Sequence, residues 1–113
     1  MAHILPVFPV ADVAATLDWY GQTLGFTEHM RVPGPDGRIY NGRAGRGGVA
    51  LMFNFNPAEA PQSGGGIWNW MYLDGEDVDA LFEEFQAKGV QVVEAPKDQF
   101  WGDRSFTIRD CNG

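Results

Sequence analysis

Three aromatic residues stand at alternate positions in the stretch Ile67–Leu73, which has the apolar character of a strand. Because side chains alternate between the two faces of a strand, we expect Trp68, Trp70 and Tyr72 to share one face. Indole and phenol rings bind flat aromatic molecules by stacking and bind cationic groups by cation–π contact. The alternative is that the rings fill a protein core, and the sequence leaves both interpretations open.

The other reactive side chains form no evident catalytic pair. His3 and His29 have no obvious serine or cysteine neighbour, and the single Cys111 lies near the end of the chain. The glycine-rich run over residues 45–48 has the composition of a turn and lacks the spacing of a phosphate-binding loop. Arg104 is a candidate contact for an anionic ligand group, although an arginine at the start of a strand is more often solvated.

The aromatic stretch belongs to the second half of an internal repeat. The stretches Asp12–Phe26 and Asp77–Val90 both begin with Asp-Val and end with glycine followed by an apolar residue. In each, apolar residues recur at helical spacing, the aspartate can cap the first turn, and the glycine can adopt the left-handed conformation that ends a helix. Since apolar, strand-like runs flank both helices, the sequence predicts two strand–helix–strand–strand modules.

The expected strands follow the same order in both modules. In the first module they are Ile4–Val10, Thr27–Val32, Arg38–Arg43 and Val49–Phe55. In the second they are Ile67–Leu73, Val90–Glu94 and Ser105–Arg109, with a loop over Ala95–Gln99. We expect one domain, with module one at residues 1–55, a linker rich in Pro, Ala, Ser and Gly at 56–66, and module two at 67–113.

Composition narrows the classes of partner. A hydrophobic content of 44% and a charged content of 20% are typical of a soluble globular protein. The net charge of −7 argues against nucleic acid, whose phosphates require a basic face. No apolar run approaches the ~20 residues of a membrane span, and the N-terminus lacks the features of a signal peptide. We therefore expect a cytoplasmic protein without a nucleic-acid or membrane partner.

Short motifs along nearly the whole chain resemble the vicinal oxygen chelate superfamily, which includes glyoxalases, extradiol dioxygenases and bleomycin-resistance proteins. The motifs are Pro9–Asp12, Trp19-Tyr20, Leu24–Phe26, Gly48–Met52, Asp77–Ala80, Lys88–Val90, Trp101-Gly102 and Asp110–Gly113. The resemblance, closest to the bleomycin-resistance proteins, implies an α+β fold in which two βαβββ modules form a curled mixed sheet around a pocket. It also implies a last strand, which we expect to follow Gly113; Cys111 stands where the family commonly has proline.

Enzymes of this superfamily hold a divalent metal through His, Gln or Glu on the first and last strands of each module. The resemblance places these positions at Leu5, Met52 and Trp68, with the fourth beyond Gly113. None of the three side chains suits a hard or borderline cation, which needs oxygen or imidazole ligands. His3 shares a strand face with Leu5 and is a weak candidate ligand. We therefore expect no metal and no other cofactor.

The same resemblance turns the aromatic face of the second module toward the pocket. Strand alternation adds Met52 and Asn54, and the loop before the last expected strand adds Phe100 and Trp101. We therefore expect a non-enzymatic protein, resembling bleomycin-resistance proteins, that sequesters a neutral or cationic aromatic small molecule. The alternative is a metal-dependent lyase or dioxygenase with non-standard ligands. The resemblance also implies a homodimer.

Overall fold

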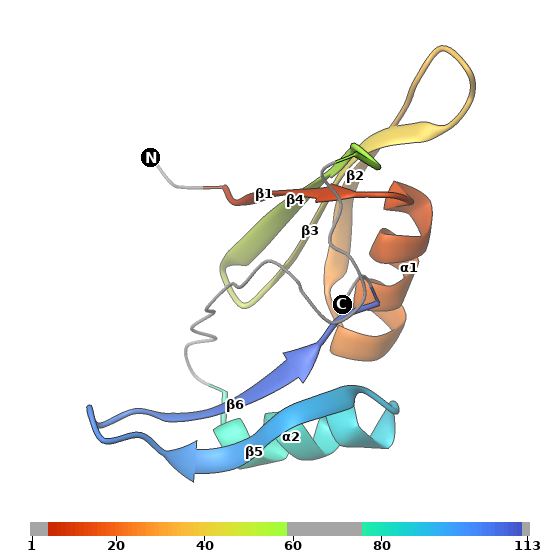
Figure 1. The fold of residues 1–113 in the computed structure, drawn as a ribbon. Helices are drawn as coiled ribbons and strands as arrows, with labels where there is room; N and C mark the ends of the chain where they lie inside the picture. Colours follow the sequence, from red (N-terminus) through yellow and green to blue (C-terminus); the bar gives the residue numbers. More distant parts are fainter. Residues whose placement is uncertain (1–4, 59–75, 112–113) are drawn as a thin grey trace.

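The computed structural model describes residues 5–58 and 76–111. The elements, in chain order, are β1 (Val7–Val10), α1 (Val13–Leu24), β2 (Thr27–Pro33), β3 (Ile39–Arg46), β4 (Val49–Phe55), α2 (Val78–Ala87), β5 (Gln91–Asp98) and β6 (Arg104–Arg109). Figure 1 shows β1–β4 with α1 on one side, and α2 with β5 and β6 as a second group. The expected strand Ile67–Leu73 lies outside the described residues.

The first module forms one mixed sheet in the spatial order β1-β4-β3-β2. β1 runs parallel to β4, and the other neighbours are antiparallel. The bounds of β4 agree with those expected, and β2 extends to Pro33. β3 is longer than the expected Arg38–Arg43, because its last residues, through Arg46, continue the ladder opposite the start of β4. β1 begins only at Val7, after Pro6, which has no amide to donate.

The second module pairs β5 with β6 in an antiparallel sheet. The expected loop over Ala95–Gln99 is wrong, because β5 continues to Asp98. Two shifts in register, between Val92 and Glu94 and between Glu94 and Lys97, accommodate the irregular part of this strand, which contains Pro96. The described strands and two helices form a curled, unclosed α+β arrangement, which confirms the expected fold class.

Both helices begin and end as the capping pattern predicts. The side chain of Asp12 accepts a hydrogen bond from the amide of Ala15 at 2.9 Å, and Asp77 caps α2 in the same way. Gly25 and Gly89 follow the two helices with φ of 70° and 83°, a left-handed conformation that side chains with a Cβ rarely adopt. No helix in residues 5–58 and 76–111 is long and apolar enough to cross a membrane.

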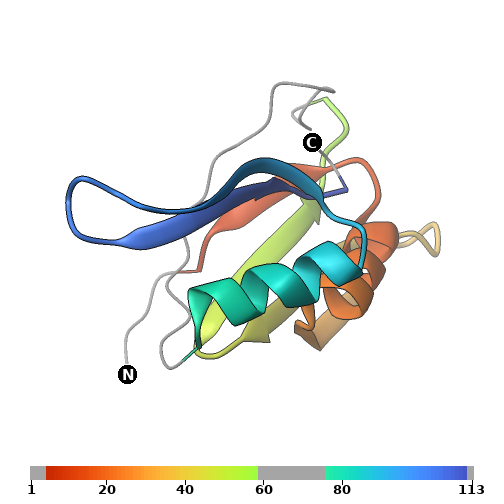
Figure 2. The ribbon, with the colours of Figure 1, turned by 90° about the horizontal axis from the view of Figure 1, so that it is seen from below.

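The core lies between α1 and the four-stranded sheet and extends into the second module. The apolar stripe of α1 is at most 5% exposed, as its spacing predicts, and consists of Val13, Leu17, Tyr20 and Leu24. Phe85 of α2 is 4% exposed and belongs to the same cluster, against which Phe106 and Ile108 of β6 also pack. Figure 2, turned by 90°, shows α2 crossing in front of the four-stranded sheet with α1 beside it.

Arg46, at the end of β3, links the two modules. Its guanidinium donates to both carboxylate oxygens of Glu76 at 3.0 and 2.6 Å and to Glu84 of α2 at 2.7 Å. It also donates to the carbonyl oxygen of Leu24 at 2.7 Å, and it lies 5.7 Å from the centroid of the Phe85 ring. The Arg46 side chain is only 16% exposed. Such charge-assisted, bidentate contacts are stronger than neutral hydrogen bonds.

A second link joins the end of β6 to α1. The buried Tyr20 hydroxyl donates to an Asp110 carboxylate oxygen at 2.7 Å. Burial, with the neighbouring Asp110 charge, raises the pKa of Tyr20 well above its usual range. The phenol therefore stays neutral and keeps its proton for this hydrogen bond at physiological pH.

We predict that Arg46→Ala lowers the free energy of unfolding by about 1–3 kcal/mol, less than a fully buried pair would lose because Glu84 keeps solvent contact. Arg31→Ala is the matched control, since Arg31 bridges Asp18 and Glu28 at the surface. Its loss should stay below about 1 kcal/mol. Urea unfolding of both variants measures the difference, and equal losses would contradict the role given to Arg46.

The stabilisation from Arg46 should also fade in acid. The hydrogen bond from Arg46 lowers the pKa of Glu84. The contribution of the ionised Glu84 is therefore present above its unfolded pKa of about 4.3 and is lost as the pH falls through the lowered folded value. The gap in stability between wild type and Arg46→Ala should narrow below about pH 4, and a gap of constant size from pH 7 to pH 3 would count against the assignment.

Candidate functional site

The four-stranded sheet has one face covered by α1 and one face that the described residues leave open. On β4, Leu51 and Phe53 are each 1% exposed and pack in the core beneath α1. Met52 and Asn54 alternate with them and therefore point to the other face. This agrees with the alternation expected for this strand. We name the surface opposite α1 the open face.

Residues from all four strands meet in one row across the open face. The strand register sets Val7, Met52, Arg43 and Met30 side by side on β1, β4, β3 and β2. Because cross-strand neighbours share a face, the Arg43 side chain lies between those of Met30 and Met52. An apolar surface with a few polar groups is typical of a small-molecule site.

The next row is more polar. It contains Pro9, Asn54, Asn41 and Val32. The side-chain amide of Asn41 donates to the amide oxygen of Asn54. Asn54, an expected ligand contact, is thus oriented by its neighbour on β3 and keeps its own NH₂ group for other partners.

Unlike Arg31 and Arg46, two other arginines of the sheet, Arg43 has no hydrogen-bond or ion-pair partner among the residues that the structure describes. Its Nε is buried without a hydrogen bond, and the residues that the structure describes form no ion pair with it. Arg31 contacts Asp18, and Arg46 binds two carboxylates. Sequence reasoning missed Arg43, because its position opposite Met52 depends on a register that no local pattern reveals.

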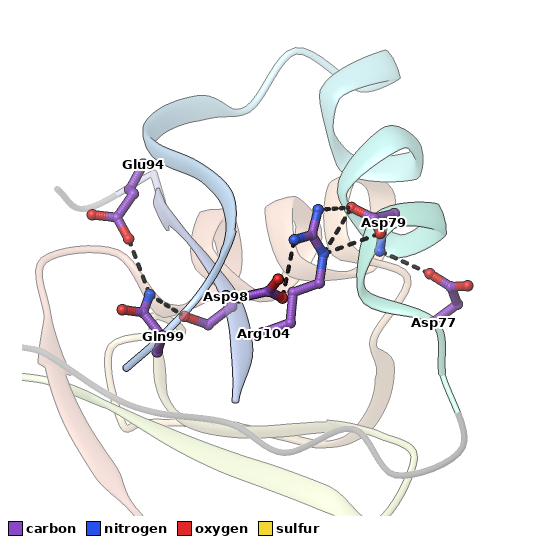
Figure 3. Close-up of polar contacts among 7 residues, drawn as sticks. Asp77, Asp79, Glu94, Asp98, Gln99 and Arg104 are labelled. Atoms are coloured by element: carbon purple, nitrogen blue, oxygen red, sulfur yellow. Dashed lines mark hydrogen bonds and ion pairs between the residues drawn. The ribbon is translucent and has the colours of Figure 1, made fainter. Parts of the chain in front are cut away.

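Arg104, considered above for an anionic ligand group, already has two carboxylate partners. Its guanidinium lies 2.9 Å from Asp79 of α2 and 3.2 Å from Asp98 of β5 (Figure 3). The hydrogen bond from Arg104 lowers the pKa of Asp79. The same close-up shows Gln99 donating to Glu94. Since its charge is already balanced, Arg104 serves to hold β5 and β6 against α2.

Phe100 and Trp101 lie in the turn between β5 and β6. Their rings meet edge to face at 4.9 Å, and they are 96% and 51% exposed. Figures 1 and 2 show this turn projecting away from the four-stranded sheet. The structure therefore places Met52 and Asn54 together on the open face but does not bring the Phe100–Trp101 pair to them within one chain.

The other expected site residues are Trp68, Trp70, Tyr72 and the candidate ligand His3, all of which lie outside the described residues. Their roles stay predictions from the sequence. The structure places two of the expected site residues, Met52 and Asn54, on the face of the sheet that is turned away from α1.

The open face does not fit a divalent metal. Leu5 has no donor atom, and the Met52 thioether is a soft ligand that suits neither a hard nor a borderline cation. Arg43, next to Met52 in the row, would repel a cation. Within residues 5–58 and 76–111, no group of three His, Cys, Asp or Glu side chains is placed to hold a metal ion.

The described part of the chain also separates its most reactive groups. His29 is exposed on β2 and borders an open hollow of about 420 Å³ at the β3–β4 turn. Cys111 follows β6 in the other module, where partial burial and the Asp110 carboxylate raise the pKa of its thiol to about 11. The thiol is therefore protonated at neutral pH and is a weak nucleophile.

Comparison with known proteins adds to this geometry. The sequence pattern of the Glyoxalase/Bleomycin resistance protein/Dioxygenase superfamily matches residues 1–113. The chain is 34% identical over 115 residues to the uncharacterized protein Rv0887c of Mycobacterium tuberculosis (strain ATCC 25618 / H37Rv), covering 96% of this chain and 68% of that protein.

Two crystal structures illustrate the likeness of fold. TnmS3, an antibiotic binding protein from Streptomyces sp. CB03234, is 30% identical with a TM-score of 0.74, covering 100% of this chain and 90% of that chain. A bleomycin resistance determinant encoded on the transposon Tn5 is 23% identical with a TM-score of 0.76, covering 100% of this chain and 92% of that chain. At this identity the likeness shows a shared fold only. The chain belongs to the glyoxalase/bleomycin resistance protein/dioxygenase superfamily.

Proposed function

We propose that this protein binds and sequesters an aromatic small molecule without transforming it. The observation that carries the proposal is the open face, where Met52, which the resemblance places at a metal-ligand position, lies between Val7 and Arg43. The description of TnmS3 as an antibiotic binding protein, at 30% identity, supports binding as the activity.

The aromatic class of the ligand follows from the sequence of the second module. Trp68, Trp70 and Tyr72 stand at alternate positions in the sequence, and the shared strand face expected for them would by itself suit a neutral or cationic ring. The exposed Phe100–Trp101 pair is a second aromatic surface, which lies apart from the open face within one chain.

The proposal includes no metal cofactor. A metal-dependent lyase or dioxygenase would need ligands other than Leu5 and Met52, with His3 as one of them. Metal analysis of protein purified without chelator discriminates between the two functions.

We also propose that the protein is a homodimer. β2 is an edge strand of the four-stranded sheet, and the Phe100–Trp101 turn exposes two aromatic rings. Unpaired strand edges and exposed apolar surface favour association, and most soluble homo-oligomers are two-fold dimers.

Substitution of the aromatic face should weaken binding of a flat ligand. Trp68→Ala and Trp70→Ala should each reduce the affinity for anthracene-2-carboxamide by about 1–3 kcal/mol, the loss expected for stacking contacts that bury a ring. Tryptophan fluorescence during titration measures the affinity. Trp19→Phe is the control, because Trp19 packs against the core on α1, and it should leave the affinity unchanged. If no quencher reaches the fluorescence of Trp68 and Trp70 and no ligand changes it, these side chains fill the core and the binding surface lies elsewhere.

The oligomeric state can be measured directly. Light scattering at micromolar concentration should give twice the 12.5 kDa chain mass. A monomeric mass would contradict the homodimer and would leave the binding proposal standing.

A further inference from the structure

We propose that Arg43 is the recognition point for an anionic oxygen, so that the ligand is an aromatic molecule bearing a carboxylate or an equivalent acidic oxygen. The inference rests on the proposed function and narrows it, since the aromatic face alone would accept neutral and cationic rings as well. The evidence for it comes from β3 and its neighbouring strands, and not from the aromatic residues of the second module.

Within residues 5–58 and 76–111, no carboxylate pairs with Arg43. Its cross-strand neighbours on the open face are Met30 and Met52, and neither can accept a strong hydrogen bond. The chain has fifteen acidic residues against eight lysines and arginines, so carboxylates are plentiful. Arg31, Arg46 and Arg104 each contact two of them.

A buried guanidinium nitrogen without a partner is unusual. Most buried polar groups in folded proteins have a hydrogen-bond partner, and an arginine stays charged at all relevant pH values. The Nε of Arg43 is buried and unpaired in the described structure. A methionine in the same row would fill this place without an unpaired donor, so Arg43 is explained better by a ligand than by packing.

The surroundings of Arg43 define the class of ligand. A guanidinium donates in a planar fork that matches the two oxygens of a carboxylate. The flanking thioether chains of Met30 and Met52 are flexible and polarisable and can adapt to the face of an aromatic ring. Low polarity around the pair strengthens its electrostatic attraction. A ring with an acidic oxygen therefore matches this row in both charge and shape.

Two anthracene derivatives test the inference: anthracene-2-carboxylate and anthracene-2-carboxamide, which share a ring and differ in charge. The wild type should bind the carboxylate about tenfold or more tightly than the amide, because a hydrogen bond to a charged partner is stronger than a neutral one. Arg43→Met should weaken carboxylate binding by about tenfold to hundredfold and should largely abolish the preference.

Two further variants keep the test specific. Arg43→Lys retains the charge without the fork and should restore part of the preference. Arg31→Met is the matched control, because Arg31 lies on a neighbouring strand with its side chain paired to Asp18 of α1. It should leave both affinities unchanged. Arg43→Met should melt no lower than the wild type, since it removes an unpaired buried donor.

Distinct results would overturn the two proposals. Equal binding of both derivatives by the wild type, with Arg43→Met unchanged, would overturn the role of Arg43 and leave the proposed function standing. Loss of both affinities together with a lower melting temperature in Arg43→Met would show a structural role and overturn the inference. If Arg43→Met changes the oligomeric state but not the ligand preference, Arg43 contacts a second copy of the chain, and the inference is overturned. Absence of binding of either derivative to the wild type would overturn both proposals.

Discussion

The polar link between the two modules centres on the guanidinium of Arg46, which contacts groups from both. It joins the end of β3 to the last turn of α1 through the Leu24 carbonyl and to the second module through Glu76 and Glu84. The neighbouring chain must leave room for it. A Cβ at Gly25 would lie 2.6 Å from an Arg46 nitrogen, and Gly25 also has a φ of 70°. Both the cap of α1 and the link between modules therefore require glycine at this position.

The arginines of β3 illustrate how one strand can serve stability and binding separately. Arg46 reaches the side of the second module and is satisfied by carboxylates, whereas Arg43 reaches the open face and has no partner in the described ranges. A partnered arginine contributes to folding, and an unpartnered one disfavours it until a ligand supplies the missing acceptor. By the same reasoning Arg104 is not a ligand contact, because Asp79 and Asp98 already balance its charge.

Sequence reasoning predicted the features that local chemistry determines. Asp12 caps the start of α1 through a side-chain hydrogen bond, and Gly25 ends the helix in a left-handed conformation. Alternation along β4 correctly assigned Met52 to the face opposite the core. The length of β5 was not predictable, because Pro96 suggests a break that the register shifts in fact accommodate. Arg43 was missed for a different reason. Its neighbours come from other strands, and only the register shows that its described cross-strand neighbours are Met30 and Met52 and not carboxylates.

The central claim is that the ligand lies on the open face, in the row that contains Arg43. Methyl NMR of protein with ¹³C-labelled methionine tests it directly, because Met30 and Met52 flank Arg43 in that row. With assignments from single Met→Leu variants, addition of anthracene-2-carboxylate should shift the Met30 and Met52 methyl signals together and saturably. If the ligand binds by fluorescence while both signals stay in place, the binding site lies elsewhere and the account is wrong.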